Sequence, residues 1–264
     1  GMIDQFKLLI SDDCDQATIK QLKQLAISYG FAVVNSLDEL NDHDSKLAIF
    51  TLNKNHLCLN LMLDDRMHQL TFDFIEGELA FRTKRVSKSN ESIAKAIGCK
   101  PNFRPKVLDA TAGMGRDALI MATLGCQVLM QERNLAVFLL LEDALNRFRL
   151  VDSQISELMS LGFNDSNKVM INEPIDVIYL DPMFPQRKKS ALVKKEMRLF
   201  KLLVGDDPDA DNLLTQSIDY FKKQNLAGRV VVKRPVSAPH LNEMKPNHQI
   251  RSKNHRYDIY LVIS

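Results

Sequence analysis

Apolar and polar positions follow one pattern up to about residue 80 and a different one after it. In the first part, short apolar runs alternate with polar turns. These runs predict strands at 6–10, 31–34, 47–52, 57–62 and 70–74, with a helix at about 16–29. The last three strands are spaced closely enough to form a meander. We therefore expect residues 1–80 to form a small α+β domain.

From about residue 91 strands and helices alternate. The pattern predicts helices at 91–97, 116–124 and 134–147, and strands at 106–110, 126–131, 148–152, 175–181, 229–233 and 256–263. The last strand could insert antiparallel. Such alternation is typical of a doubly wound, mostly parallel sheet with helices on both faces. The 264 residues suffice for both parts, so we expect residues 81–264 to form one α/β domain.

One expected connection is unusually short. The helix that ends near Asn146 meets a strand that starts at Phe148 with almost no residues between them. A helix-to-strand loop normally takes about 2–6 residues. Two explanations stay open: a true deletion in this protein, or residues missing from the sequence.

The stretch Asp181-Pro182-Met183-Phe184-Pro185 follows the apolar run 177–180, which predicts a buried strand. A carboxylate, a rigid proline and an aromatic ring at the carboxyl end of such a strand suit the binding of a flat nitrogenous base. Asp181 and the carbonyl of Pro182 can accept hydrogen bonds from an exocyclic amine, and Phe184 can stack on the ring. The alternative for Phe184 is ordinary packing in the core.

A glycine-rich loop lies upstream, between the strand 106–110 and the helix 116–124, and contains Gly113 and Gly115. Glycines let the backbone approach a ligand, and the first strand–helix junction of a doubly wound sheet holds nucleotide-like cofactors. Glu132 ends the next strand, where an acid can accept hydrogen bonds from ribose hydroxyls. The spacing Gly113-x-Gly115-x-x-Ala118 also fits dinucleotide binding, so a nicotinamide-dependent oxidoreductase is an alternative, although no hydride-transfer partner is evident.

The net charge of +2 conceals an asymmetry. Residues 1–80 carry 13 acids and 6 bases, whereas the rest of the chain carries 20 acids and 29 bases. Many of these bases follow the Asp181–Pro185 motif, where phosphate contacts would bring a nucleic acid strand to the site. The candidate RNA-binding residues are Arg187, Lys188, Lys189, Lys194, Lys195, Arg198, Lys233 and Arg234.

The chain shows no signal-peptide pattern and no apolar run of membrane-spanning length, so we expect a cytoplasmic protein without a membrane partner. Its four scattered cysteines are expected to be buried free thiols of a reducing compartment. The six histidines lack metal-ligand spacing, and no metal is expected.

The glycine-rich loop, Glu132-Arg133-Asn134 and Tyr179–Pro185 resemble the class I S-adenosylmethionine (SAM)-dependent methyltransferases. The segments 189–198, 231–235 and 255–260 more narrowly resemble the RsmJ family, bacterial enzymes that methylate N2 of a guanine near the 3′ end of 16S ribosomal RNA. The resemblance covers roughly residues 75–264. It implies a Rossmann-like, seven-stranded sheet, SAM as cofactor, and 16S rRNA, within the small ribosomal subunit, as partner.

Position by position, the candidate catalytic residues are Asp181, Pro182 and Phe184. The candidate cofactor-binding residues are Asp109, Gly113, Gly115, Arg116, Asp117, Glu132, Arg133, Ser153, Gln154 and Asp181. Ser153 and Gln154 enter through an alignment of residues 149–154 with the third strand of the family. One departure is that the family's glycine-rich stretch before the helix at 91 is here Val-Ser-Lys-Ser-Asn, residues 86–90.

Other functions stay open at this point. Asp-Pro-x-Phe also resembles the motifs of amino-group methyltransferases that act on DNA adenine or on protein glutamine. A ribosome factor that only binds RNA would keep the basic residues but would not need an intact cofactor loop. The family-like run 189–198 favours the rRNA enzyme.

Overall fold

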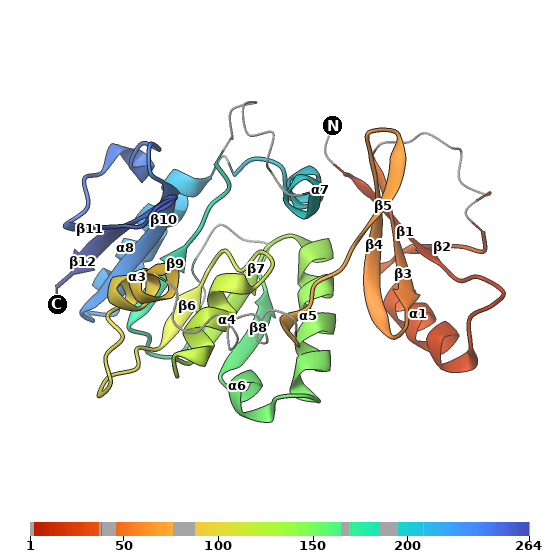
Figure 1. The fold of residues 1–264 in the computed structure, drawn as a ribbon, viewed down its shortest axis with the longest axis horizontal. Coiled ribbons are helices and arrows are strands. Elements are labelled where there is room, and N and C mark those ends of the chain that lie inside the picture. Colours follow the sequence, from red (N-terminus) through yellow and green to blue (C-terminus); the bar gives the residue numbers. More distant parts are fainter. Residues whose placement is uncertain are drawn as a thin grey trace. The chain divides into compact units, whose positions relative to one another are not determined.

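The structure, a computed structural model, describes residues 3–36, 38, 46–75, 88–164, 169, 171–184, 195–207 and 209–263. These residues form two compact units (Figure 1). The first unit runs up to Phe72 and includes helix α7 (Lys195–Val204) and Gly205, and the second contains the other described residues from Asp73 onward. The first unit thus ends before the expected boundary at residue 80. Helix α7, which was not predicted, groups with it although residues 81–264 were expected to form one domain.

The first unit is built on a five-stranded sheet in the order β2-β1-β3-β4-β5. Its elements are β1 (Gln5–Leu9), α1 (Gln16–Tyr29), β2 (Ala32–Val34), β3 (Leu47–Asn53), β4 (His56–Leu63) and β5 (Arg66–Leu70). Helix α1 begins where the Asp15 carboxylate accepts a hydrogen bond from the Thr18 amide at 2.7 Å, and it ends at Gly30, whose φ of 69° suits a residue without Cβ. The small α+β domain is confirmed.

The strand expected at 70–74 is wrong, because β5 ends at Leu70. Asp64 and Asp65 both have positive φ, 52° and 60°, and form a two-residue hairpin turn that pairs Leu63 with Arg66. The turn therefore starts the strand earlier than the apolar run indicates.

The second unit contains a seven-stranded sheet in the order β11-β12-β10-β9-β6-β7-β8. Its strands are β6 (Val107–Asp109), β7 (Val128–Glu132), β8 (Met159–Phe163), β9 (Val177–Leu180), β10 (Gly228–Pro235), β11 (His248–Arg251) and β12 (His255–Val262). All neighbouring pairs from β10 to β8 are parallel, while β12 is antiparallel to both β10 and β11. The mostly parallel, seven-stranded sheet is confirmed, and the last strand is antiparallel. Strand β11 was not predicted.

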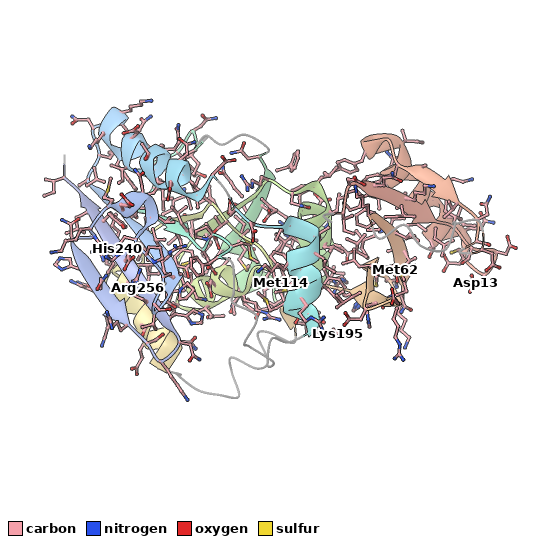
Figure 2. The ribbon with its side chains drawn as sticks, turned by 90° about the horizontal axis from the view of Figure 1, so that it is seen from above. Asp13, Met62, Met114, Lys195, His240 and Arg256 are labelled. Atoms are coloured by element: carbon pink, nitrogen blue, oxygen red, sulfur yellow. The ribbon has the colours of Figure 1, made fainter. Side chains whose placement is uncertain are left out.

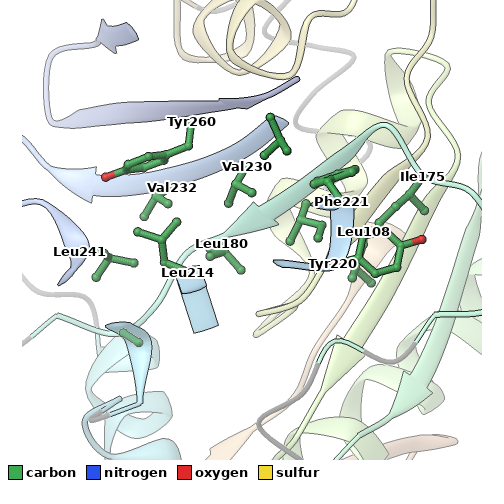
Figure 3. Close-up of a cluster of buried hydrophobic side chains, with 13 residues drawn as sticks. Leu108, Ile175, Leu180, Leu214, Tyr220, Phe221, Val230, Val232, Leu241 and Tyr260 are labelled. Atoms are coloured by element: carbon green, nitrogen blue, oxygen red, sulfur yellow. The ribbon is translucent and has the colours of Figure 1, made fainter. Parts of the chain in front are cut away.

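Helices pack on both faces of this sheet (Figure 1). They are α3 (Lys88–Ile97), α4 (Arg116–Thr123), α5 (Leu135–Arg149), α6 (Ser153–Glu157) and α8 (Ala210–Lys223), followed by a short 3₁₀ helix, η2 (Leu241–Glu243). The face toward α8 carries a buried apolar cluster (Figure 3) that includes Leu180, Leu214, Phe221, Val232 and Tyr260. This cluster fixes β9, which is followed by the candidate catalytic residues, and β10, whose carboxyl end carries Lys233 and Arg234.

The strand expected at 148–152 is also wrong. Helix α5 continues to Arg149 and buries Phe148, whereas Leu150 and Val151 are 88% and 63% exposed. The third parallel strand is β8, and residues 150–158, which include α6, form the connection to it. The expected near-absence of a connecting loop is therefore wrong, because it depended on the strand expected at 148–152.

Candidate active site

The carboxyl ends of β6, β7, β9 and β10 lie along one edge of the sheet, because these strands are parallel. Asp109, Glu132, Asp181 and the pair Lys233-Arg234 are at or directly after these ends. The chain proceeds from β6 to β7 on one side and places β9 on the other, so β6 and β9 flank a topological switch point. In open α/β sheets, ligands bind in the crevice at such a point.

The glycine-rich loop turns sharply between β6 and α4. Gly113 and Gly115 have φ of 56° and 77°, values that favour glycine. A Cβ on Gly115 would lie 2.6 Å from the Phe74 ring and 3.2 Å from a methyl carbon of Leu141. Gly115 therefore lets the start of α4 pack closely, which brings Asp117, in the first turn of the helix, to the edge of the sheet.

Glu132 closes the loop from the side of β7. Its Oε2 accepts a hydrogen bond from the Gly113 amide at 3.0 Å, and its Oε1 accepts from the amides of Arg133 and Asn134, both at 3.2 Å. Burial raises the pKa of Glu132 to about 7, although these three amides oppose the shift. A buried, oriented carboxyl group next to the glycine-rich loop is a suitable acceptor for ribose hydroxyls.

Asp181 is tied to the same loop through its backbone. Its amide donates to Thr111 Oγ1 at 2.6 Å, and the Thr111 amide donates to Asp109 Oδ1 at 3.2 Å. The Asp181 side chain is 44% exposed and accessible to a ligand. Partial burial of the carboxyl group raises the pKa of Asp181 to about 6. Lys233 and Arg234 lower this pKa, and Asp117 raises it. Burial, reinforced by Asp117, also raises the pKa of Asp109.

Lys233 joins two of these carboxylates. Its Nζ lies 3.1 Å from Asp117 Oδ2 and 3.9 Å from Asp181 Oδ2. The Tyr179 hydroxyl donates to the same oxygen of Asp117 at 2.7 Å. The first turn of α4, the end of β9 and the end of β10 thus meet through charged and polar side chains.

Phe184 lies over a cation. The guanidinium carbon of Arg234 is 5.0 Å from the centroid of the Phe184 ring, a cation–π contact. Arg234 is only 5% exposed, and its Nε and Nη2 donate to the Pro239 carbonyl at 3.3 and 3.1 Å. The ring of the candidate stacking residue is therefore supported from the protein side, and Phe184 itself is half-buried.

A buried ion pair lies next to this support on β12. Asp258 accepts hydrogen bonds from Arg256 Nε and Nη2 at 2.8 and 3.0 Å and interacts with His240 Nδ1 at 3.0 Å. Arg256 Nη1 in turn donates to the Val236 carbonyl at 2.8 Å. Figure 2 labels Arg256 and His240, which lie close together in this part of the unit. Arg256 and Arg234 are register partners on neighbouring strands. Because Arg256 contacts the Val236 carbonyl and Asp258 contacts His240, the ion pair holds the chain that follows β10.

The predicted RNA-binding residues have different surroundings. Arg187, Lys188, Lys189 and Lys194 lie outside the described residues. Lys195 is exposed at the start of α7, and Arg198 pairs with Asp64 at 3.0 Å within the first unit. Lys233 and Arg234 are largely buried in the site and contact protein groups.

Two predicted cofactor residues lie elsewhere. Ser153 and Gln154 begin α6, which directly precedes the amino end of β8, whereas the other candidates lie at the carboxyl edge. Their alignment with the third strand fails because residues 148 and 149 belong to α5 and the third parallel strand is β8. Arg116 and Arg133 are at the expected positions, and Arg133 pairs with Asp207 and Asp209 at 2.6 and 3.7 Å.

Sequence reasoning missed Thr111 and Tyr179, and it left Tyr257 open between a core residue and a site residue. Tyr179 lies on β9 two positions before Asp181. Because side chains alternate between the two faces of a strand, this spacing could have placed both residues on one face of the sheet. Tyr257 is the register partner of Lys233 and raises no signal before the antiparallel pairing of β12 is known.

A family model described as a SAM-dependent methyltransferase matches residues 34–262 of this chain. Proteins named ribosomal RNA small subunit methyltransferase J are similar over most of their length. The protein from Haemophilus influenzae is 41% identical over 262 residues, covering 97% of this chain and 96% of that protein. The one from Psychromonas ingrahamii is 40% identical over 250 residues, covering 94% and 93%. The chain belongs to the ribosomal RNA small subunit methyltransferase J family.

The fold of this methyltransferase agrees with a solved relative. A SAM-dependent methyltransferase from Neisseria gonorrhoeae superposes with a TM-score of 0.68 at 27% identity, covering 97% of this chain and 96% of that chain. The seven-stranded sheet is therefore that of a class I methyltransferase. Its cofactor is SAM.

The residues present fit SAM. Glu132 offers a buried acceptor for ribose hydroxyls, and Gly113 and Gly115 remove the Cβ at two positions of the loop where a cofactor could approach the backbone. Asp117 and Asp181 place carboxylates at the same edge of the sheet, which suit a cationic sulfonium and an ammonium group. Among the described residues no group of three or more His, Cys, Asp or Glu could hold a metal ion, and none of the described helices is long and apolar enough to cross a membrane.

We expect the affinity for SAM to increase as Glu132 ionises. A charged acceptor forms stronger hydrogen bonds than a neutral one, so the dissociation constant should fall about fivefold as the pH rises from 6 to 8, through the Glu132 pKa of about 7. Glu132→Gln should bind about tenfold more weakly and lose this pH dependence. Isothermal titration calorimetry at several pH values measures both effects. An unchanged pH dependence in Glu132→Gln would assign it to another group.

Proposed function

We propose that this methyltransferase transfers a methyl group from SAM to the exocyclic N2 of a guanine in 16S rRNA, near its 3′ end. Two features of the segment after β9 carry the proposal. Asp181 is hydrogen-bonded to Thr111 of the cofactor loop, and Phe184, three residues later, has its ring packed on Arg234. The named relatives are small subunit rRNA methyltransferases, which supports rRNA as the substrate. The assembled small subunit is the proposed form of that substrate.

Guanine N2 is a poor nucleophile because its lone pair is delocalised into the ring. SAM, when bound, supplies an electrophilic methyl group. The Asp181 carboxylate and the Pro182 carbonyl would accept the two N–H groups of the amine, orient its lone pair and stabilise the positive charge that develops on nitrogen. The nitrogen loses a proton after transfer, and Asp181, with a pKa of about 6, can take it on its way to solvent.

The base itself would stack on Phe184. Arg234 supports the ring and is buried, so the ring can keep its position when a base is absent. A guanine that is paired in a helix cannot reach a crevice at the sheet edge, so the target must be unpaired or flipped out. The amino-group substrates of the other candidate reactions, adenine and glutamine, would use the same acceptors. The family membership favours rRNA over both.

The test is direct. The purified protein is incubated with labelled SAM and small ribosomal subunits from cells that lack this activity, and the RNA is digested and analysed by mass spectrometry. N2-methylguanosine is the expected product. Label in another nucleoside would contradict the guanine N2 assignment, and label only in the ribosomal proteins of the subunit would contradict rRNA.

We expect Phe184→Ala to raise KM for the ribosomal subunit and to lower kcat/KM by about 10- to 100-fold, because one base–aromatic stacking contact contributes about 1–3 kcal/mol. Phe184→Tyr keeps a stacking surface and should retain most of the activity. Steady-state kinetics with subunit concentration varied at saturating SAM give the comparison. Equal activity of Phe184→Ala and wild type would show that Phe184 is a packing residue.

A further inference from the structure

Lys233 is buried among carboxyl groups rather than exposed to a nucleic acid. Its side chain is 16% exposed, and its position on β10 opposite Tyr257 of β12 directs it to the face of the sheet that carries α4. The neighbouring residue Arg234 serves the other face, where it supports Phe184. Lys233 is therefore available to the carboxylates of the site and not to phosphates outside it.

The two carboxylates that contact Lys233 are held differently. Asp117 receives hydrogen bonds from Lys233 Nζ at 3.1 Å and from the Tyr179 hydroxyl at 2.7 Å, so its position is fixed by two donors. Asp181 Oδ2 lies 3.9 Å from the same Nζ, an ion pair without a close hydrogen bond. Within the described part of the chain its oxygens receive no hydrogen bond, so they can accept hydrogen bonds from a substrate amine while the ammonium still attracts them.

We infer that Lys233 is a positioning residue of the methyl-transfer site: anchored on Asp117, its ammonium holds the Asp181 carboxylate ionised and directed toward the substrate amino group. The inference rests on the proposed role of Asp181. It also links the first turn of α4, which begins directly after the cofactor loop, to the residue that contacts the substrate.

The charges around Asp181 determine what removal of the ammonium does. Titratable or charged groups face it from every neighbouring element: Lys233 and Arg234 on β10, Asp117 on α4, Asp109 on β6, Tyr179 on β9 and Tyr257 on β12. Lys233 lowers the pKa of Asp181 and Asp117 raises it. Without Lys233, burial and Asp117 act unopposed except by Arg234, so Asp181 should ionise at higher pH.

The experiment is the pH dependence of kcat at saturating SAM and subunit concentrations, from pH 5 to 9.5. Wild type should lose activity as the pH falls through about 6, the pKa of Asp181. In Lys233→Met the midpoint should move up by about one pH unit, so that the variant is roughly twofold slower at pH 7, approaches tenfold slower at pH 5, and recovers toward pH 9. Lys233→Arg should restore much of the wild-type midpoint. Lys222→Met, an exposed lysine at the end of α8, serves as the control.

A second variant moves the midpoint the other way. Asp117→Asn removes a charge that raises the pKa of Asp181, so its acid limb should lie below that of wild type, and this holds even if Lys233→Met does not fold. His255 lies near Lys233 and Asp117, and burial lowers its pKa. Because the acid limb is assigned to Asp181 and not to His255, His255→Gln should keep the wild-type midpoint of the pH profile of kcat.

The outcomes separate the inference from the proposed function. A loss of activity in Lys233→Met that is equal at every pH, or an unchanged profile in both variants, would overturn the positioning role. Wild type that forms no N2-methylguanosine at any pH would overturn the proposed function instead. Opposite shifts in the two variants, with a wild-type profile in Lys222→Met, would establish the role of Lys233.

Discussion

We expect Asp181→Ala to lower kcat by about 100- to 1000-fold, the typical cost of removing one group that stabilises developing charge in a transition state. The reason is that Asp181 is the exposed carboxylate of the crevice, and its backbone is fixed to Thr111 of the cofactor loop. Cofactor binding should change much less, by about threefold, because Glu132 and the loop backbone remain. The substitution thus separates turnover from binding.

Single-turnover kinetics with small ribosomal subunits give the rate of transfer, and calorimetry gives the affinity for SAM. Glu157→Ala is a matched control, since this acid is exposed on α6, before the amino end of β8. A parallel loss of turnover and affinity in Asp181→Ala would contradict the proposed role and make Asp181 a cofactor ligand first.

The parts of the fold that the sequence predicts well are those with local causes. Helix α1 matches its predicted range because its N-cap carboxylate and its terminal glycine are adjacent in sequence to the residues that they serve. The glycine-rich loop and the acid at the end of β7 were recognisable for the same reason. In these places a short segment contains the whole physical explanation.

The failures have non-local causes. Phe148, Leu150 and Val151 form an apolar run, but only Phe148 packs into the core, and nothing in the run itself distinguishes it from a strand. Lys233 comes directly after the apolar run of β10, so the hydrophobic pattern alone predicts that its side chain is exposed to solvent. Asp117 and Asp181 neutralise it across the sheet, and these contacts span 116 and 52 residues of sequence.

We expect Asp258→Ala to reduce the free energy of unfolding of the second unit by about 3–5 kcal/mol, because removing one partner of a buried ion pair leaves the other charge buried without compensation. Asp258 is fully buried and holds two nitrogens of Arg256, which is itself 4% exposed. Burial alone would raise the pKa of Asp258, but Arg256 and His240 lower it, so the carboxylate is ionised in the folded protein at neutral pH. Its contribution is therefore present near pH 7 and is lost as the pH falls through the lowered pKa.

Urea unfolding followed by tyrosine fluorescence measures this effect. The chain has no tryptophan, and of its five tyrosines only Tyr29 lies in the first unit, so the signal reports mainly on the second unit. The double variant Arg256→Met, Asp258→Leu removes both charges and should recover a large part of the lost stability, since apolar pairs can replace buried ion pairs at little cost. If Asp258→Ala unfolds at the wild-type urea concentration, the ion pair is not a determinant of this fold. If the double variant is no more stable than Asp258→Ala, the loss comes from His240 and Gln249, which also contact Asp258, rather than from the uncompensated charge of Arg256.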